Sequence, residues 1–231
     1  MEVDVTLNLD KLKMSPEESA TDKTSVSLPL DSFRDDNQHR YFVLNKPYNM
    51  VSQFVSPHPV NLLGDLDFTF PEGTHAIGRL DNHSEGLLLL TTNKKVTRLL
   101  FSGSKAHKRV YLVQINQILS SDNLAVLRTG VKIRIGIDEF YTTPPCEVIV
   151  VEDPKSRYAF SNDCADFGPH TWLTITLYEG KYHQVRKMMG AIHHRCKRLI
   201  RLSIEGIDID NLNPGCISEL SEEVFFSKLN I

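Results

Sequence analysis

Four consecutive leucines, at positions 87–90, constrain the fold of this chain more than any other feature of its sequence. An unbroken apolar run cannot alternate between a core and water, so the segment is expected to be buried. The run is short and lies between Gly86 and Asn93, which favours a buried strand. Its periodicity alone fits a buried turn of helix almost as well.

A charged turn precedes the leucines and contains Arg79 and Asp81, two residues apart. If buried strands flank this turn, Asp81 is held rigidly, as a catalytic carboxylate must be. Taken without further context, a solvated turn with an Asp–Arg surface pair is the better explanation of these two residues.

The whole segment over residues 78–93, with Gly78-Arg79-Leu80-Asp81 at its start, resembles the signature of a known enzyme family. That family comprises the A-type pseudouridine synthases of the small ribosomal subunit, together with their large-subunit relatives. Blocks at 109–111 (Arg-Val-Tyr) and 179–188 (Glu-Gly-Lys-Tyr-His-Gln-Val-Arg-Lys-Met) support the resemblance in the right order. Residues 45–54 resemble the opening motif of the family and are most similar to the E-type large-subunit enzymes.

The resemblance covers roughly residues 41–220 and implies a bifurcated central sheet with flanking helices and a cleft across it. It implies isomerisation of a specific uridine to pseudouridine in ribosomal RNA, most similar to the large-subunit enzymes, with no cofactor and no metal. The many short strands and few helices independently favour a mixed, largely antiparallel α+β fold.

The resemblance also assigns three catalytic residues. The catalytic aspartate of the family falls on Asp81, and a basic residue from a later helix, Arg186, is expected beside it to hold the carboxylate ionised. Tyr111 matches the active-site tyrosine, whose ring would stack on the uracil and whose hydroxyl would assist proton transfer. Whether Asp81 adds to the sugar or the base, or removes a sugar proton, stays open.

Cations along the chain predict where RNA binds. Residues 181–201 contain seven lysines and arginines and no acid, which is typical of an RNA-backbone footprint, although such runs are commonly solvated faces. Arg79 is expected to fill the gap left by a flipped base, with a structural ion pair as the alternative. Lys46 is expected to reach a phosphate or to be a solvated turn residue. The full predicted set of substrate-binding and RNA-binding residues is Lys46, Arg79, Arg109, Lys181, His183, Gln184, Lys187 and Arg201.

Three other functions compete with this interpretation. His193, His194 and Cys196 suggest a metal site, but the fourth ligand and the usual spacing are missing. Asp81 with Glu85 or Glu179 would form the carboxylate pair of a glycosidase. A non-catalytic RNA-binding factor for ribosome assembly would keep the fold without the reaction.

Charge divides the chain into two parts. Residues 1–38 hold four basic and nine acidic residues, a net charge of −5, which leaves +2 for the remainder. The leader is expected to be flexible, without the small RNA-binding domain that family members often carry, and residues 39–231 to form the catalytic domain. A short strand over residues 3–9 is possible.

The cysteines and the apolar pattern bear on location and assembly. The four cysteines form no Cys-x-x-Cys pair, which argues against a zinc ribbon and a disulfide scaffold and suits a reducing cytoplasm. No signal peptide or membrane-spanning run is present. We expect a monomer.

The remaining pattern predicts secondary structure along the chain, with Asp122 as a helix N-cap and Gly130 as a helix stop. Strands are expected over residues 41–46, 48–54, 109–116, 131–137, 146–151, 172–178 and 198–207, and helices over 61–66, 94–101, 122–127 and 182–191. Residues 154–169 are expected to be an irregular loop.

Overall fold

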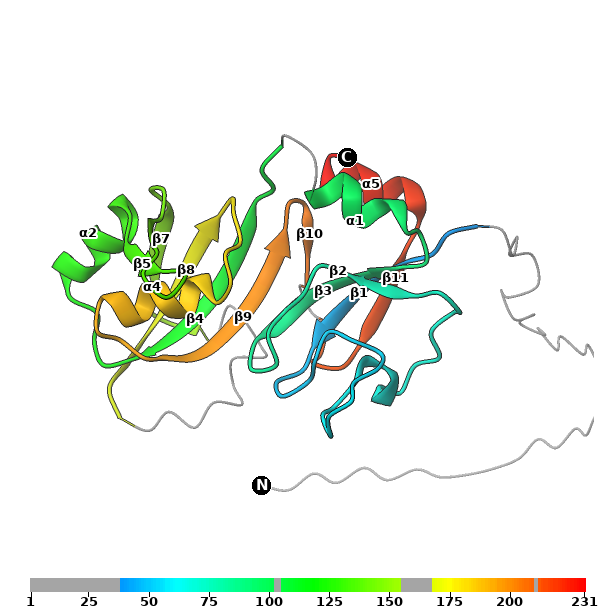
Figure 1. Ribbon diagram of the computed structural model, residues 1–231, viewed down its shortest axis with the longest axis horizontal. Coiled ribbons are helices and arrows are strands. Elements are labelled where there is room, and N and C mark those ends of the chain that lie inside the picture. Colours follow the sequence, from blue (N-terminus) through cyan, green and yellow to red (C-terminus); the bar gives the residue numbers. More distant parts are fainter. Residues whose placement is uncertain (1–37, 102–104, 155–167, 210–211) are drawn as a thin grey trace, which may run out of the picture. The chain divides into compact units, whose positions relative to one another are not determined.

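The computed structural model describes residues 38–101, 105–154, 168–209 and 212–231, and His39–Ile231 form one compact unit (Figure 1). Nearly all of the expected leader, including the possible strand over residues 3–9, lies outside the described residues, as does most of the expected loop at 154–169. The division of the chain at residue 38 stays a prediction.

Short strands and a few helices make up this unit. The strands are β1 (Tyr41–Lys46), β2 (His75–Ile77), β3 (Glu85–Thr91), β4 (Arg109–Asn116), β5 (Lys132–Arg134), β6 (Phe140–Thr142), β7 (Glu147–Val151), β8 (His170–Leu177), β9 (Cys196–Ile204), β10 (Ile207–Asp208) and β11 (Ile217–Leu220). The helices are the 3-10 helix η1 (Leu63–Asp65), α1 (Lys95–Phe101), α2 (Ser121–Thr129), α4 (Gln184–Ala191) and α5 (Glu222–Leu229).

One large sheet runs through the unit in the order β11-β1-β3-β9-β4-β8-β7, with β2 paired to β3 and β10 to β9. The pairings within it are antiparallel except that of β3 with β9, which is parallel. The predicted α+β class with a mixed, largely antiparallel sheet is confirmed.

The leucine run is a central strand, as the first of its two interpretations predicts, and every residue of β3 is buried. Leu87 and Leu89 pack into a cluster with Tyr41 and Phe225. Leu88 and Leu90 point to the opposite face of the sheet and pack into a separate cluster. An apolar core on each face therefore explains why the leucines do not alternate with polar residues.

The other half of the sheet has its own core. Leu173 and Ile175 of β8 pack with Met188 and Met189 of α4 and with Leu127 of α2. Figure 1 shows α2 and α4 over this half, while α1 and α5 cover the half that contains β1 and β3. The two halves meet where β3 pairs with β9.

That junction is short and crowded. It contains two register pairs, Glu85 with Ile200 and Gly86 with Arg201. Gly86 has φ +96°, and a Cβ atom there would lie 2.3 Å from the carbonyl oxygen and 2.7 Å from the amide nitrogen of Arg201. Only glycine allows both this conformation and this approach of the two backbones.

Several sequence-based expectations were wrong or incomplete. Residues 48–54 form no strand, because Ser52 bonds to the backbone of Leu80 and Met50 makes one isolated bridge. The predicted strand at 131–137 is limited to β5, which pairs with β6 alone. Ser120, not Asp122, caps α2, because its side chain accepts from the amide of Asn123. The helix α5 was not predicted.

The junction generates a stability prediction. Gly86→Ala forces a Cβ atom into the backbone of β9, and we expect a loss of about 3 kcal/mol or more in the free energy of unfolding. Urea denaturation measures it.

Gly190→Ala is the matched control, because a Cβ at this position in α4 meets nothing within 4 Å. It should be neutral or stabilise the protein by up to about 1 kcal/mol. Equal effects of the two substitutions would contradict the importance of the junction.

Candidate active site

A cavity of about 830 Å³ lies beside the junction and is lined by the β2–β3 loop, the start of β4, β9 and the turn between β8 and α4. It brings together residues that lie far apart in the sequence. Of the predicted site residues it contains Asp81, Tyr111, Arg79, Arg109, Lys181, His183, Gln184 and Arg201, and it excludes Lys46, Arg186 and Lys187.

Asp81 follows a buried anchor. Leu80 is buried, and its amide and carbonyl both bond to the hydroxyl of Ser52 at 3.0 Å. The carbonyl of Asp81 accepts from the amide of Ser84 at 3.0 Å, which closes the turn into β3. The Asp81 side chain is about a third exposed, so a rigid loop presents a carboxylate to the cavity.

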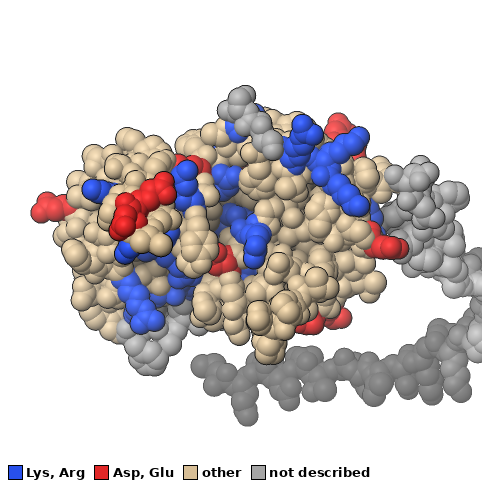
Figure 2. All heavy atoms as spheres, viewed as in Figure 1, with Lys and Arg blue, Asp and Glu red and all other residues tan. Residues whose placement is uncertain are grey.

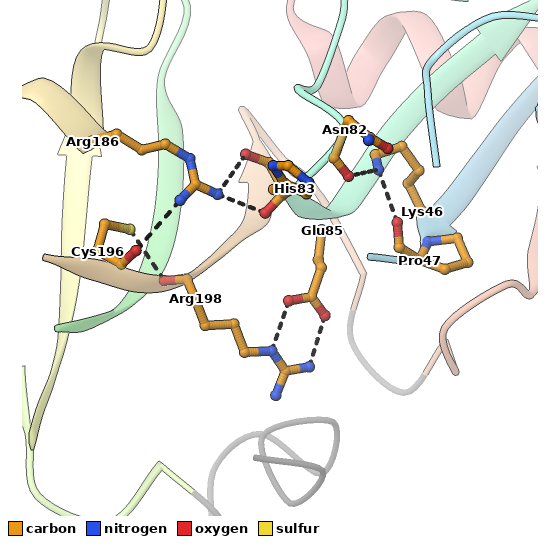
Figure 3. Close-up of polar contacts among 9 residues, drawn as sticks. Lys46, Pro47, Asn82, His83, Glu85, Arg186, Cys196 and Arg198 are labelled. Carbon is orange, nitrogen blue, oxygen red and sulfur yellow. Dashed lines mark hydrogen bonds and ion pairs between the residues drawn. The ribbon is translucent and has the colours of Figure 1, made fainter. Parts of the chain in front are cut away.

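Lys46 behaves differently from either expectation. It is fully buried, and its ammonium donates to the carbonyl of Met50 at 2.6 Å. It also donates to the carbonyls of Pro47 at 2.8 Å and Asn82 at 3.5 Å (Figure 3). It is therefore neither a phosphate contact nor a solvated turn residue. Burial lowers its pKa to about 8, an effect that the nearby carboxylates of Glu85 and Asp81 oppose. Lys46 therefore ties the end of β1 to the loop that carries Asp81.

Arg186 does not form the expected ion pair with Asp81 in the part of the chain that the structure describes. Its guanidinium donates to the carbonyl of His83 at 2.5 Å, to the hydroxyl of Ser84 at 3.4 Å and to the carbonyl of Cys196 at 3.4 Å (Figure 3). Arg186 thus connects α4 and β9 to the Asp81 loop. The predicted contact was wrong because backbone carbonyls take this guanidinium; its role in catalysis stays a prediction.

Among the residues that the structure describes, the basic side chain that pairs with Asp81 is a histidine. His183 Nε2 lies 3.4 Å from Asp81 Oδ1, and both side chains are about a third exposed. His183 has a left-handed backbone with φ 54°, and its ring stacks on Tyr182 at a centroid distance of 3.9 Å. The sequence predicted His183 as an RNA contact and gave no sign of its pairing with Asp81.

Gln184 is buried and supports the turn that carries His183. Its amide donates to Glu179 at 2.6 Å and accepts from the backbone of Lys181 at 2.8 Å. Tyr141 donates its hydroxyl to the same Glu179 carboxylate at 2.5 Å. Gln184 thus has a structural role in this network, which Tyr141, a residue that the sequence did not single out, completes. The expected contact of Gln184 with RNA stays a prediction.

Tyr111 and Arg201 face each other across strands. They are direct register partners on β4 and β9, so their side chains project from the same face of the sheet and lie side by side. Arg201 also donates to the carbonyl of Leu87 at 2.8 Å and is only 5% exposed. Burial lowers its pKa, while Tyr111 and Asp81 oppose that shift. Arg201 is thus too buried to follow phosphates as expected.

The basic segment divides into structural and exposed cations. Arg198 forms two parallel bonds with Glu85 at 2.7 and 2.8 Å (Figure 3). Lys181, Arg195 and Lys197 are exposed, and Lys187 is half-buried. Figure 2 shows lysine and arginine side chains gathered near the middle of the viewed face. The footprint is therefore smaller than the sequence predicted.

Two arginines at the cavity, Arg79 and Arg109, differ in exposure and in their contacts. Arg79 is exposed where the β2–β3 loop lines the cavity. Arg109 is half-buried, donates to the carbonyl of His107 at 3.2 Å and lies over the ring of Phe101. The role of Arg79 in filling the gap of a flipped base stays a prediction.

Two of the competing functions, a glycosidase and a metal site, do not fit the described residues. A glycosidase needs a second free carboxylate, but Glu85 is bonded to Arg198 and Glu179 to Tyr141 and Gln184. His194 is buried and bonded to the carbonyl of Asn116. The described residues contain no group of three His, Cys, Asp or Glu side chains placed to hold a metal ion. They also contain no helix with the length and apolar character needed to cross a membrane.

Comparisons with known proteins agree with this site. A family model described as RNA pseudouridylate synthase matches residues 40–191. The chain is 33% identical over 187 residues to the ribosomal large subunit pseudouridine synthase E of Vibrio vulnificus, covering 80% of this chain and 76% of that protein. It is 31% identical over 185 residues to the ribosomal small subunit pseudouridine synthase A of Salmonella typhimurium, covering 80% and 71%. A solved pseudouridylate synthase aligns with a TM-score of 0.66 and 25% identity over 83% of this chain and 74% of that one.

Lys46 generates a pH prediction. Below pH 8 the folded and the unfolded chain both carry its charge, so the folded state bears the full unfavourable free energy of burying it. Between pH 8 and its ordinary pKa of 10.5 the unfolded chain alone stays protonated, so the contribution of Lys46 to stability rises with pH. Relative to Lys46→Met, the wild type should gain about 2 kcal/mol between pH 8 and about pH 10, measured by urea unfolding at each pH. If the difference in the free energy of unfolding between the wild type and Lys46→Met does not change over this pH range, the lowered pKa of Lys46 is contradicted.

Proposed function

The chain belongs to the RNA pseudouridylate synthase family and is an enzyme that isomerises uridine in RNA, and from this premise we propose that its substrate is ribosomal RNA of the large subunit. The support for this choice is the similarity to E-type large-subunit enzymes, at 33% and 32% identity. The A-type small-subunit enzymes are similar at 31%, so a small-subunit target is the alternative that the experiment below must separate.

The observation that carries the proposed catalysis is that Asp81 and Tyr111 line the same cavity. At about 830 Å³ the cavity is within the usual range for small-molecule sites and has room for a flipped nucleotide. Asp81 comes from a loop anchored at Leu80, and Tyr111 from a strand inside the sheet, so both are held by rigid elements.

The reaction breaks the bond between the sugar C1′ and the uracil N1, turns the base, and joins C1′ to C5. A proton leaves C5 and one is gained at N1, so atoms balance without an oxidant or reductant. We propose that Asp81 is the carboxylate that acts at the bond between the sugar and the base. Tyr111 contributes a ring that holds the detached base and a hydroxyl that handles a proton. Arg186 acts through the loop, by fixing the His83 carbonyl.

The target uridine must leave its stack to reach this cavity. Arg79 has a long side chain with a planar guanidinium and is exposed at the cavity. We propose that it fills the space that the flipped base leaves in the RNA stack. Lys181, Arg195 and Lys197 are exposed and would neutralise phosphates on either side. The lining residues all lie between positions 51 and 204, which supports residues 39–231 as the catalytic domain, and we propose that the enzyme acts as a monomer.

The first test maps pseudouridine in ribosomal RNA from cells that lack the protein and carry the wild type, Asp81→Asn or Asp122→Asn. Carbodiimide labelling with primer extension reads each site. We expect one large-subunit site to vanish in the deletion and to return with the wild type and with Asp122→Asn. Asp122 is a matched carboxylate in the first turn of α2 and does not line the cavity.

Asp81→Asn should leave the site unmodified while RNA affinity stays within about threefold of the wild type. Restoration by Asp81→Asn would rule out Asp81 as the catalyst. A lost site in the small subunit would correct the substrate, and an unchanged ribosomal map with intact RNA binding would favour a non-catalytic assembly factor.

A second prediction concerns salt. Changing Lys181, Arg195 and Lys197 together to Met removes up to three phosphate contacts, so the slope of log affinity against log salt should become shallower by about 2. Filter binding from 50 to about 200 mM salt measures it. The matched control changes the exposed residues Lys94, Lys95 and Lys228, which do not line the cavity. Equal slopes for the two triple variants would place the RNA elsewhere.

A further inference from the structure

Arg201 has a position that neither stability nor RNA binding explains. We propose that Arg201 is a positioning residue for the isomerisation, which orients the hydroxyl of Tyr111 toward the substrate and provides a buried positive charge facing Asp81. This inference rests on the proposed function and adds a residue to its site.

The burial of Arg201 is energetically unfavourable. Its guanidinium forms no ion pair with a carboxylate within the described part of the chain, and its Nη2 atom is buried without a hydrogen-bond partner there. Arg198, three residues earlier on the same strand, donates from Nε and Nη2 to the two carboxylate oxygens of Glu85. A buried guanidinium that lacks such a partner destabilises the fold, so its presence calls for another reason.

Arg201 lies on β9 between β3 and β4. On one side it is the register partner of Gly86 in β3, and on the other it is the register partner of Tyr111 in β4. The bond from its Nε to the carbonyl of Leu87 at 2.8 Å fixes the direction of the guanidinium. A side chain held in this way by a central strand can place a second group accurately.

Hydrogen-bond chemistry sets the direction of the Tyr111 hydroxyl. A guanidinium only donates, so in the proposed contact between these two register partners the oxygen of Tyr111 accepts. The proton of that hydroxyl then points away from Arg201 and is free to be donated into the cavity, which Tyr111 lines. Arg201 therefore makes Tyr111 a donor toward the substrate.

Arg201 also belongs to the set of charged groups that face Asp81. Lys46 from β1 and His183 from the turn before α4 also act on Asp81. Arg79 from the same loop lines the same cavity, and the Glu85 carboxylate at the start of β3 acts on Lys46. Arg79 is exposed and His183 about a third exposed, so water and salt screen them. Arg201 and Lys46 are buried, and their charges act on Asp81 with less screening.

A double-mutant cycle tests the link to Tyr111. Single-turnover rates at saturating enzyme are compared for wild type, Arg201→Lys, Tyr111→Phe and the double variant. We expect Arg201→Lys to lower the rate at least tenfold, roughly, while RNA affinity stays within about threefold. The rate of the double variant should stay within about threefold of the rate of Tyr111→Phe. If Arg201 acts through the Tyr111 hydroxyl, Arg201→Lys has little further effect once that hydroxyl is absent.

Arg128→Lys is the matched control for a structural arginine. Arg128 is exposed, donates to the carbonyl of Val148 at 2.9 and 2.7 Å, and does not line the cavity. It should lower the stability without changing the single-turnover rate. Independent, multiplicative effects of Arg201→Lys and Tyr111→Phe, or an unchanged rate in Arg201→Lys, would overturn the proposal.

A second measurement needs neither activity nor a substitution at Arg201. In protein labelled with ¹⁵N-arginine, Tyr111→Phe should shift the side-chain resonances of Arg201, and Tyr141→Phe, whose hydroxyl bonds to Glu179, should not. No shift in Tyr111→Phe would overturn the contact. If the wild type forms no pseudouridine, the proposed function fails, and this spectrum still decides whether Arg201 holds Tyr111.

Discussion

The parallel contact of β3 with β9 is the constraint on which the rest of the structure depends. Each half of the sheet has its own helices and its own core, and the halves join through two register pairs at Glu85 and Gly86. A side chain at position 86 would overlap the backbone of Arg201, so the join exists only because this residue is glycine. The cavity lies beside that join, and the residues that line it come from both halves.

Asp81 is placed by groups that do not themselves line the cavity. The buried ammonium of Lys46 reaches the carbonyl of Asn82, and Arg186 reaches the carbonyl of His83, so the two residues after Asp81 are held from two sides. Cations that bond to carbonyls fix a loop without neutralising its carboxylate, which leaves Asp81 available for chemistry. Arg201 does line the cavity, but it likewise donates to a backbone carbonyl and is proposed to act through Tyr111.

The sequence predicted the elements whose signal is local. The leucine run, the alternation in β4 and β8 and the helix α4 follow from apolar periodicity, and the motif around Asp81 follows from the family resemblance. The sequence could not say that Lys46 and Arg201 are buried, or that the guanidinium of Arg186 bonds to backbone carbonyls, because all three look like surface residues until the sheet forms around them. The helix α5 was missed, although Ser221 caps it and Phe225 fills the core, because no spacing in so short a segment distinguishes it from a loop.

The central claim is that the target uridine enters the cavity between Asp81 and Tyr111. Photocrosslinking tests it most directly, with 4-thiouridine at the modified position of an RNA fragment and the crosslinked peptide identified by mass spectrometry. The account predicts a crosslink to the β2–β3 loop or to the start of β4, and its loss when unlabelled target RNA competes. Crosslinks confined to the exposed cations at Arg195 and Lys197, with none in the cavity, would contradict it.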